Sequence, residues 1–309
     1  MWRPPVQPVL RSPTGATTPA RGRVYISYRV LADEGDWLRV IHNGQVAWLR
    51  KADVVRAADA IDHFTALIRA DPTNTSWPLY RGSAYREIGK YDDGIRDYDE
   101  LIAKHPGVYT YWNNRASIKI TARRYASAIA DLDKAAELSP GAAVVYRNRG
   151  HAKLLNKDYK AAVADLDQAA GLEPAAAAPH VYRGQCREKL GEYAAAAKEF
   201  EEALAREPLN PAALSARAWF LATVPDDKLR DGAAALKLAE QACDLFDWKT
   251  GSYLDAVAAA CAAVGRFDDA VRYAEAALRD KKFAAEKGDE AKARLDLYRQ
   301  GKPYRQPPK

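Results

Sequence analysis

The sequence predicts a mainly all-α protein, a solenoid of antiparallel helix pairs that follows a small β barrel-like unit. Apolar residues recur at helical spacing over most of the chain, whereas residues 24–55 carry strand-forming runs instead. The 309 residues, 48% apolar and 28% charged, have the composition of a globular chain. The decisive observation is a proline every 34 residues, at Pro72, Pro106, Pro140, Pro174 and Pro208.

Residues 24–55 predict three strands. The runs Val24–Val30, Asp36–His42 and Gln45–Arg50 are rich in Val, Ile, Tyr and Trp. Asn43-Gly44 separates the last two runs, and this dipeptide favours the tight turn of a β-hairpin because both of its residues accept positive φ. We therefore expect an antiparallel hairpin here.

The β unit resembles the closing half of a bacterial Src-homology-3-like barrel. The residues that carry the resemblance are Gly35 to Val40, Gly44, Trp48 to Arg50 and Asp53 to Val55, although Ala47 stands where the family usually has glycine. A complete barrel needs a first strand from Pro5 to Arg11, within the basic, Pro-rich segment 1–23. The alternative is an incomplete β lid packed on the first helix.

Several columns share the 34-residue period of the prolines. Small residues recur at Gly82, Ala116, Gly150, Gly184 and Ala218, and aromatic residues at Tyr91, Tyr125, Tyr159 and Tyr193. The small residues let paired helices approach closely, and we expect the aromatic residue that starts each second helix to fill the space beside them. Proline ends each pair because it cannot continue a helix. One pair cannot bury its apolar face alone, so the pairs are expected to stack.

This pattern resembles the tetratricopeptide repeat, as in Tyr146, Gly150, Ala162, Leu166, Ala169 and Pro174. We expect a solenoid over residues 56–285, which comprises a capping half-repeat (56–72), four regular repeats (75–210) and two divergent units (211–285). The divergent units include a longer turn from Val224 to Asp231. A capping helix (286–300) and a solvated tail (301–309) complete the chain.

Composition and motifs argue against several functions. Of the net charge of +6, residues 1–56 carry nine Lys or Arg against four Asp or Glu, so there is no basic stripe along the repeats and we do not expect a nucleic-acid partner. The histidines are scattered, and no nucleophile constellation or Gly-rich phosphate loop is present. We therefore expect no enzyme activity, no metal and no cofactor. Cys186, Cys243 and Cys261 are interpreted as core residues.

The longest apolar stretch, Ala256 to Val264, has nine residues, so no membrane span is expected. The N-terminus has no apolar core of the secretory type, and we expect a cytoplasmic protein. An envelope location would require a start further upstream. The sequence does not indicate an oligomeric state.

An arginine recurs on each first helix, and acidic residues recur on each second helix. The arginines are Arg81, Arg115, Arg149, Arg183 and Arg217, and the acids are Asp97, Asp131, Asp165 and Glu199, with a second set at Asp99, Asp133, Asp167 and Glu201. Because they recur in every repeat, we interpret them as a structural ladder of salt bridges. The alternative is a basic track for an acidic ligand.

In the tetratricopeptide family, the first helices line a concave groove, and the resemblance places a partner-binding site there. The corresponding residues are Ser83, Asn113, Asn114, Ser117, Arg147, Asn148, His151, Tyr182, Gln185, Trp219 and Asp255. This largely uncharged set could hydrogen-bond the backbone of an extended peptide. It does not reproduce the Lys and Asn clamp by which chaperone co-factors of the family hold a C-terminal carboxylate.

The leading hypothesis is a non-enzymatic protein–protein interaction scaffold that holds a protein or peptide segment in this groove. The alternative is a cell-envelope adaptor whose β unit binds a cell-wall or peptide ligand.

Overall fold

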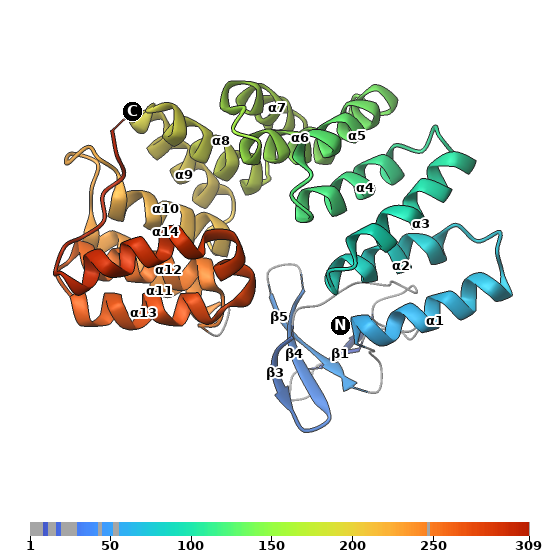
Figure 1. Ribbon diagram of the computed structural model, residues 1–309, viewed down its shortest axis with the longest axis horizontal. Coiled ribbons are helices and arrows are strands. Elements are labelled where there is room, and N and C mark those ends of the chain that lie inside the picture. Colours follow the sequence, from blue (N-terminus) through green and yellow to red (C-terminus); the bar gives the residue numbers. More distant parts are fainter. Residues whose placement is uncertain are drawn as a thin grey trace. The chain divides into compact units, whose positions relative to one another are not determined.

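The computed structural model describes residues 9–11, 17–19, 30–42, 45–51, 56–245 and 248–308 (Figure 1). Residues 1–152 and 153–309 form two compact units. Unit 1 contains the strands and the helices up to Ala152, and unit 2 contains the helices from Lys153 onward.

The strands form two antiparallel sheets. One pairs β1 with β2, and the other has the order β3-β4-β5; the bounds are β1 (Val9–Arg11), β2 (Thr17–Pro19), β3 (Val30–Glu34), β4 (Trp37–His42) and β5 (Gln45–Arg50). The register pairs His42 with Gln45, which matches the predicted hairpin, while Asn43-Gly44 itself lies outside the described residues. Among the described strands no closed barrel is formed, and the Src-homology-3-like barrel is not supported.

From Ala57 to Arg299 the described chain is mainly helical, as the 34-residue period predicts. The helices in unit 1 and across its boundary are α1 (Ala57–Ala70), α2 (Ser76–Glu87), α3 (Tyr91–Lys104), α4 (Tyr109–Thr121), α5 (Tyr125–Leu138) and α6 (Ala143–Leu155). Those of unit 2 are α7 (Tyr159–Leu172), α8 (Ala177–Leu190), α9 (Tyr193–Arg206), α10 (Pro211–Thr223), α11 (Gly232–Asp244), α12 (Gly251–Ala263), α13 (Phe267–Arg279) and α14 (Lys281–Arg299). The recurring prolines follow the ends of α1, α3, α5, α7 and α9, as expected of residues that cannot continue a helix.

Small residues let the helices of a pair approach closely, but the ring that fills the space is not the predicted one. The recurring tyrosines do begin the second helices. However, a Cβ on Gly82 would lie 2.8 Å from Cε2 of Tyr98, and a Cβ on Gly184 would lie 2.7 Å from Cε1 of Phe200. Tyr98 and Phe200 stand two turns into α3 and α9, where their rings face the core, and both are almost completely buried.

The turn before α11 is longer than the others, as the break in period predicts. The Nη1 of Arg230 donates to the carbonyl oxygens of Val224 and Pro225, at 2.8 and 2.9 Å, and so holds this turn. The turn leaves Thr223, the last residue of α10, completely buried.

Helix α14 begins at Lys281, before the predicted start at residue 286. Its start is fixed by Asp280, whose carboxylate accepts hydrogen bonds from the backbone N–H groups of Lys282 and Phe283. After α14, residues 302–308 form no regular secondary structure, and in Figure 1 this red segment runs back along unit 2. The predicted solvated tail is wrong for Arg305 and Gln306, since Gln306 is only 9% exposed and both side chains bond to unit 2.

Candidate functional site

The recurring arginines lie between helices and are neutralised there. In unit 1, Nε and Nη2 of Arg115 on α4 donate to both carboxylate oxygens of Asp131 on α5, at 2.9 and 2.7 Å. The Nη1 of Arg115 donates to Asp99 on α3, at 2.5 Å. One guanidinium therefore joins its own helix pair to the preceding pair.

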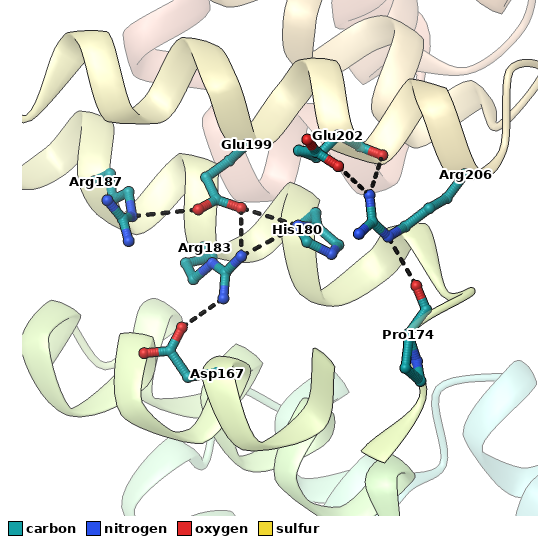
Figure 2. A network of polar contacts seen from close by, with 8 residues as sticks. All are labelled: Asp167, Pro174, His180, Arg183, Arg187, Glu199, Glu202 and Arg206. Atoms are coloured by element: carbon teal, nitrogen blue, oxygen red, sulfur yellow. Dashed lines mark hydrogen bonds and ion pairs between the residues drawn. The ribbon is translucent and has the colours of Figure 1, made fainter. Parts of the chain in front are cut away.

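Unit 2 repeats this arrangement, as Figure 2 shows. Arg183 on α8 donates to Glu199 on α9 at 2.7 Å and to Asp167 on α7 at 2.5 Å, and His180 adds a contact of 3.0 Å to the same Glu199 oxygen. The remaining recurring contacts are Arg81 to Asp97 and Thr65, Arg149 to Asp133, and Arg217 to Glu201. The predicted structural ladder is confirmed, and these arginines do not form a basic track.

Sequence reasoning missed a second basic residue in the ladder. Lys119, Lys153 and Arg187 each stand one helical turn after a recurring arginine and pair with Asp131, Asp165 and Glu199. Their own 34-residue spacing was the signal that could have found them. Asp131 and Glu199, at most 7% exposed, thus each face two cations, which explains how the array accommodates these buried charges.

Seven of the predicted groove residues lie on α2, α4 and α6 in unit 1, and we call them the amide surface: Ser83, Asn113, Asn114, Ser117, Arg147, Asn148 and His151. Its centre is a chain of three hydrogen-bonded amides. The Nδ2 of Asn148 donates to Oδ1 of Asn113 at 2.9 Å, and Nδ2 of Asn113 donates to Oδ1 of Asn114 at 3.3 Å. Asn113 is buried and bonds to both of the other asparagines, whereas Asn114 and Asn148 are half-buried.

The serines of the amide surface are held by neighbouring side chains. Ser83 Oγ lies 3.1 Å from the carbonyl oxygen of Leu79 and 3.2 Å from the hydroxyl of the buried Tyr98. Ser117 Oγ accepts a hydrogen bond of 3.0 Å from Arg86. These contacts fix the serine rotamers and connect α2 with both α3 and α4.

Arg147 supplies the positive charge of the amide surface. Burial, with a smaller contribution from the charge of Arg147, lowers the pKa of His151 to about 4, so this imidazole is neutral at pH 7. Half-buried Arg147 has no acidic partner among the described residues, in contrast to Arg149 two positions later, which pairs with Asp133. Within the described residues, the surface therefore combines amides and hydroxyls with one cation that has no acidic partner.

The four other predicted residues lie in unit 2. Tyr182 and Gln185 are half-buried on α8. Trp219 on α10 lies 6.0 Å from the ring of Tyr304, measured between centroids, and Asp255 on α12 accepts hydrogen bonds from Arg294 at 2.7 and 3.3 Å. Both residues thus contact α14 or the segment that follows it.

The described residues contain no group of three or more metal-ligating side chains. Cys186, Cys243 and Cys261 are buried as predicted, and burial raises the pKa of these thiols to about 12, 12 and 11. Such thiols are poor nucleophiles at neutral pH. In the part of the chain that the structure describes, no helix combines the length and apolar character that a membrane crossing requires.

Stacked antiparallel helix pairs joined by periodic polar contacts define a helical-repeat protein. The family model of the tetratricopeptide repeat matches residues 79–143 and 147–211, so these two segments have the pattern of that repeat. No curated protein sequence matches the chain. The tetratricopeptide fold indicates a protein–protein interaction scaffold, and proteins of this kind are generally non-enzymatic.

Two solved structures are similar over 79% of this chain. One is the APC/C hetero-tetramer Cut9–Hcn1, with a TM-score of 0.63 and 15% identity; the match covers 46% of that chain, so this protein spans less than half of its length. The other is a tetratricopeptide repeat protein from Parabacteroides merdae, with a TM-score of 0.62, 17% identity and 92% of that chain covered. At these identities the likeness is one of fold.

Proposed function

We propose that the protein is an interaction scaffold that binds an extended protein segment on the amide surface of unit 1. The observation that carries this proposal is Arg147, a half-buried cation with no acidic partner among the described residues, which precedes Asn148 on α6, whose amide bonds to Asn113. A carboxylate on a ligand would bind favourably to a cation that is partly removed from water. Hydrogen bonds between charged groups contribute more binding free energy than those between neutral groups.

The chemistry of the amide surface defines the ligand. Asn and Ser side chains both donate and accept, so they can pair with the N–H and C=O groups of an extended backbone. His151 is neutral at pH 7 and adds no second charge. The preferred ligand is therefore an extended segment with one acidic side chain opposite Arg147.

The test is selection from a random peptide library, followed by titration of the selected peptides. We expect enrichment of peptides with a central Asp or Glu, and a loss of affinity of about tenfold or more in Arg147→Gln/Asn148→Ala, in line with a charge-assisted hydrogen bond. Lys134→Gln is the matched control, because it removes an exposed cation on α5. Equal peptide affinity of the wild type and Arg147→Gln/Asn148→Ala would refute the assignment of the amide surface as the binding site.

The envelope-adaptor hypothesis depends on a barrel that the described strands do not form, and no other observation favours it.

A further inference from the structure

Glu188 on α8 is a buried acid that the ladder does not use. It is 5% exposed, and the equivalent positions of the neighbouring repeats are Leu154 and Ala222. Burial raises the pKa of Glu188. A buried carboxylate is destabilising unless it is hydrogen-bonded, so an acid at a position where adjacent repeats have apolar residues calls for a specific partner.

The partner of Glu188 is Gln306, which comes from the segment after α14. The amide Nε2 of Gln306 donates to Oε1 of Glu188 at 2.5 Å and to Oγ1 of Thr223 at 2.8 Å. The backbone N–H of Gln306 donates to the carbonyl oxygen of Thr223 at 2.8 Å. The glutamine is thus recognised through its side chain and its backbone at once.

The two residues before Gln306 are held as well. Nη1 of Arg305 donates to the carbonyl oxygen of Ala222 at 3.0 Å. The ring of Tyr304 packs beside Trp219, and Arg294 lies over both rings, with its Cζ 4.9 Å from the Trp219 centroid and 5.7 Å from that of Tyr304. Asp255 fixes Arg294 in this position through two hydrogen bonds.

The segment makes these contacts as a peptide ligand would. It has no regular secondary structure, its side chains contact α8, α10 and α14, and Pro307 and Pro308 are exposed beyond the last of these contacts. Arg305 also donates to the carbonyl oxygen of its neighbour Tyr304, at 3.0 Å. Three successive residues of the segment therefore each have a partner. Trp219 packs on the aromatic ring, the carbonyl oxygen of Ala222 accepts from the arginine, and the buried Glu188 accepts from the glutamine. These three contacts together can recognise an aromatic–Arg–Gln sequence.

We propose that Glu188, Thr223, Ala222 and Trp219 form a second peptide-binding site, which residues 302–308 occupy in cis and which takes an aromatic–Arg–Gln segment of a partner protein in trans. This site lies in unit 2 and does not depend on the function proposed for the amide surface. The cis segment follows α14 directly, which gives it an effective concentration of roughly millimolar, so a partner segment binds only weakly until the cis segment is weakened.

The experiment uses the full chain and a fluorescent peptide that copies residues 301–308, with binding followed by anisotropy. Arg305→Ala/Gln306→Ala weakens the cis segment, and we expect it to bind the peptide at least tenfold more tightly than the wild type does. Adding Glu188→Leu, which places at position 188 the residue of the preceding repeat, is expected to abolish this binding while the helical circular dichroism is kept. A peptide with alanine in place of the glutamine is expected not to bind.

Three outcomes would overturn the proposal. These are equal peptide affinity of the wild type and the Arg305→Ala/Gln306→Ala variant, binding that survives Glu188→Leu, and a dimer by light scattering that exchanges the segment between two copies. If the double variant does not fold, hydrogen exchange on the wild type decides instead. Excess unlabelled peptide should then speed exchange of the Gln306 amide, and unchanged exchange at saturating peptide contradicts the proposal. Arg147→Gln/Asn148→Ala should leave all these results unchanged, which separates this site from the amide surface.

Discussion

Arg115→Ala tests whether the ladder stabilises the array through its buried acids. The substitution removes a guanidinium that is 14% exposed and that bonds to Asp131 and Asp99. Of the cations that the structure describes beside Asp131, which is 5% exposed, Lys119 then remains, with its Nζ 2.7 Å from Oδ2 of the aspartate. The variant therefore leaves a buried carboxylate with half of its cationic partners.

The expected loss follows from burial. Removing one partner of a fully buried pair costs about 3–5 kcal/mol, because the other charge stays desolvated and unpaired. Lys119 retains part of this interaction, and the contact with the half-exposed Asp99 contributes about 0–1 kcal/mol. We therefore expect Arg115→Ala to lower the free energy of unfolding by about 2–3 kcal/mol.

Urea unfolding followed by far-UV circular dichroism measures this loss, with Arg217→Ala as the matched control. Arg217 occupies the same place in its repeat but pairs with Glu201, which is 57% exposed, so about 0–1 kcal/mol is expected. Adding Asp131→Asn to Arg115→Ala should recover part of the loss, because it removes the buried charge. Equal losses for Arg115→Ala and Arg217→Ala would refute the reasoning.

Three further predictions concern the core and the amide surface. Between pH 6.5 and about 4, His151 is protonated in the unfolded chain and neutral in the folded one. The free energy of unfolding should therefore fall by up to about 1.4 kcal/mol per pH unit on acidification through that window. Unfolding measured as a function of pH should show that His151→Gln removes this dependence. Gly184→Ala forces a Cβ against the Phe200 ring and should destabilise by about 1–3 kcal/mol in thermal denaturation, whereas Gly171→Ala, with nothing within 4 Å, should be neutral or stabilising. A thiol reagent at pH 8 should leave Cys186, Cys243 and Cys261 unlabelled in the native protein and label all three after unfolding. Labelling of the native chain would contradict the burial of these cysteines.

Periodic features of the fold could be predicted from the sequence because each is repeated. Arg115 and Asp131 recur 34 residues later as Arg149 and Asp165, and a contact needed in one repeat is needed in the next. The period also located the helices and the long turn before α11. It did not identify which ring packs on Gly82, because Tyr91 and Tyr98 both lie on α3 and only the three-dimensional packing distinguishes them.

Features that occur once could not be predicted in this way. The contacts of Glu188 with Gln306 and of Asp255 with Arg294 join residues far apart in sequence, and no period links them. Charge pattern alone favoured a solvated tail for Arg305, since three cations near a chain end are usually exposed. Residues of the amide surface came from the resemblance to tetratricopeptide repeats, and their role in binding stays a prediction.

The ladder also makes the chain extensible. The second to fourth regular repeats each carry an arginine for the acid of the repeat before and an acid for the arginine that follows, as Arg115 and Asp133 do in residues 109–142. A tandem duplication of these 34 residues would place Arg115 of the second copy opposite Asp133 of the first, and so would repeat the ion pairing between neighbouring repeats. An insertion of any other length would break the pairing on both sides. Whole repeats can therefore be gained or lost while the arginines and acids between neighbouring repeats stay paired and the repeats continue to stack.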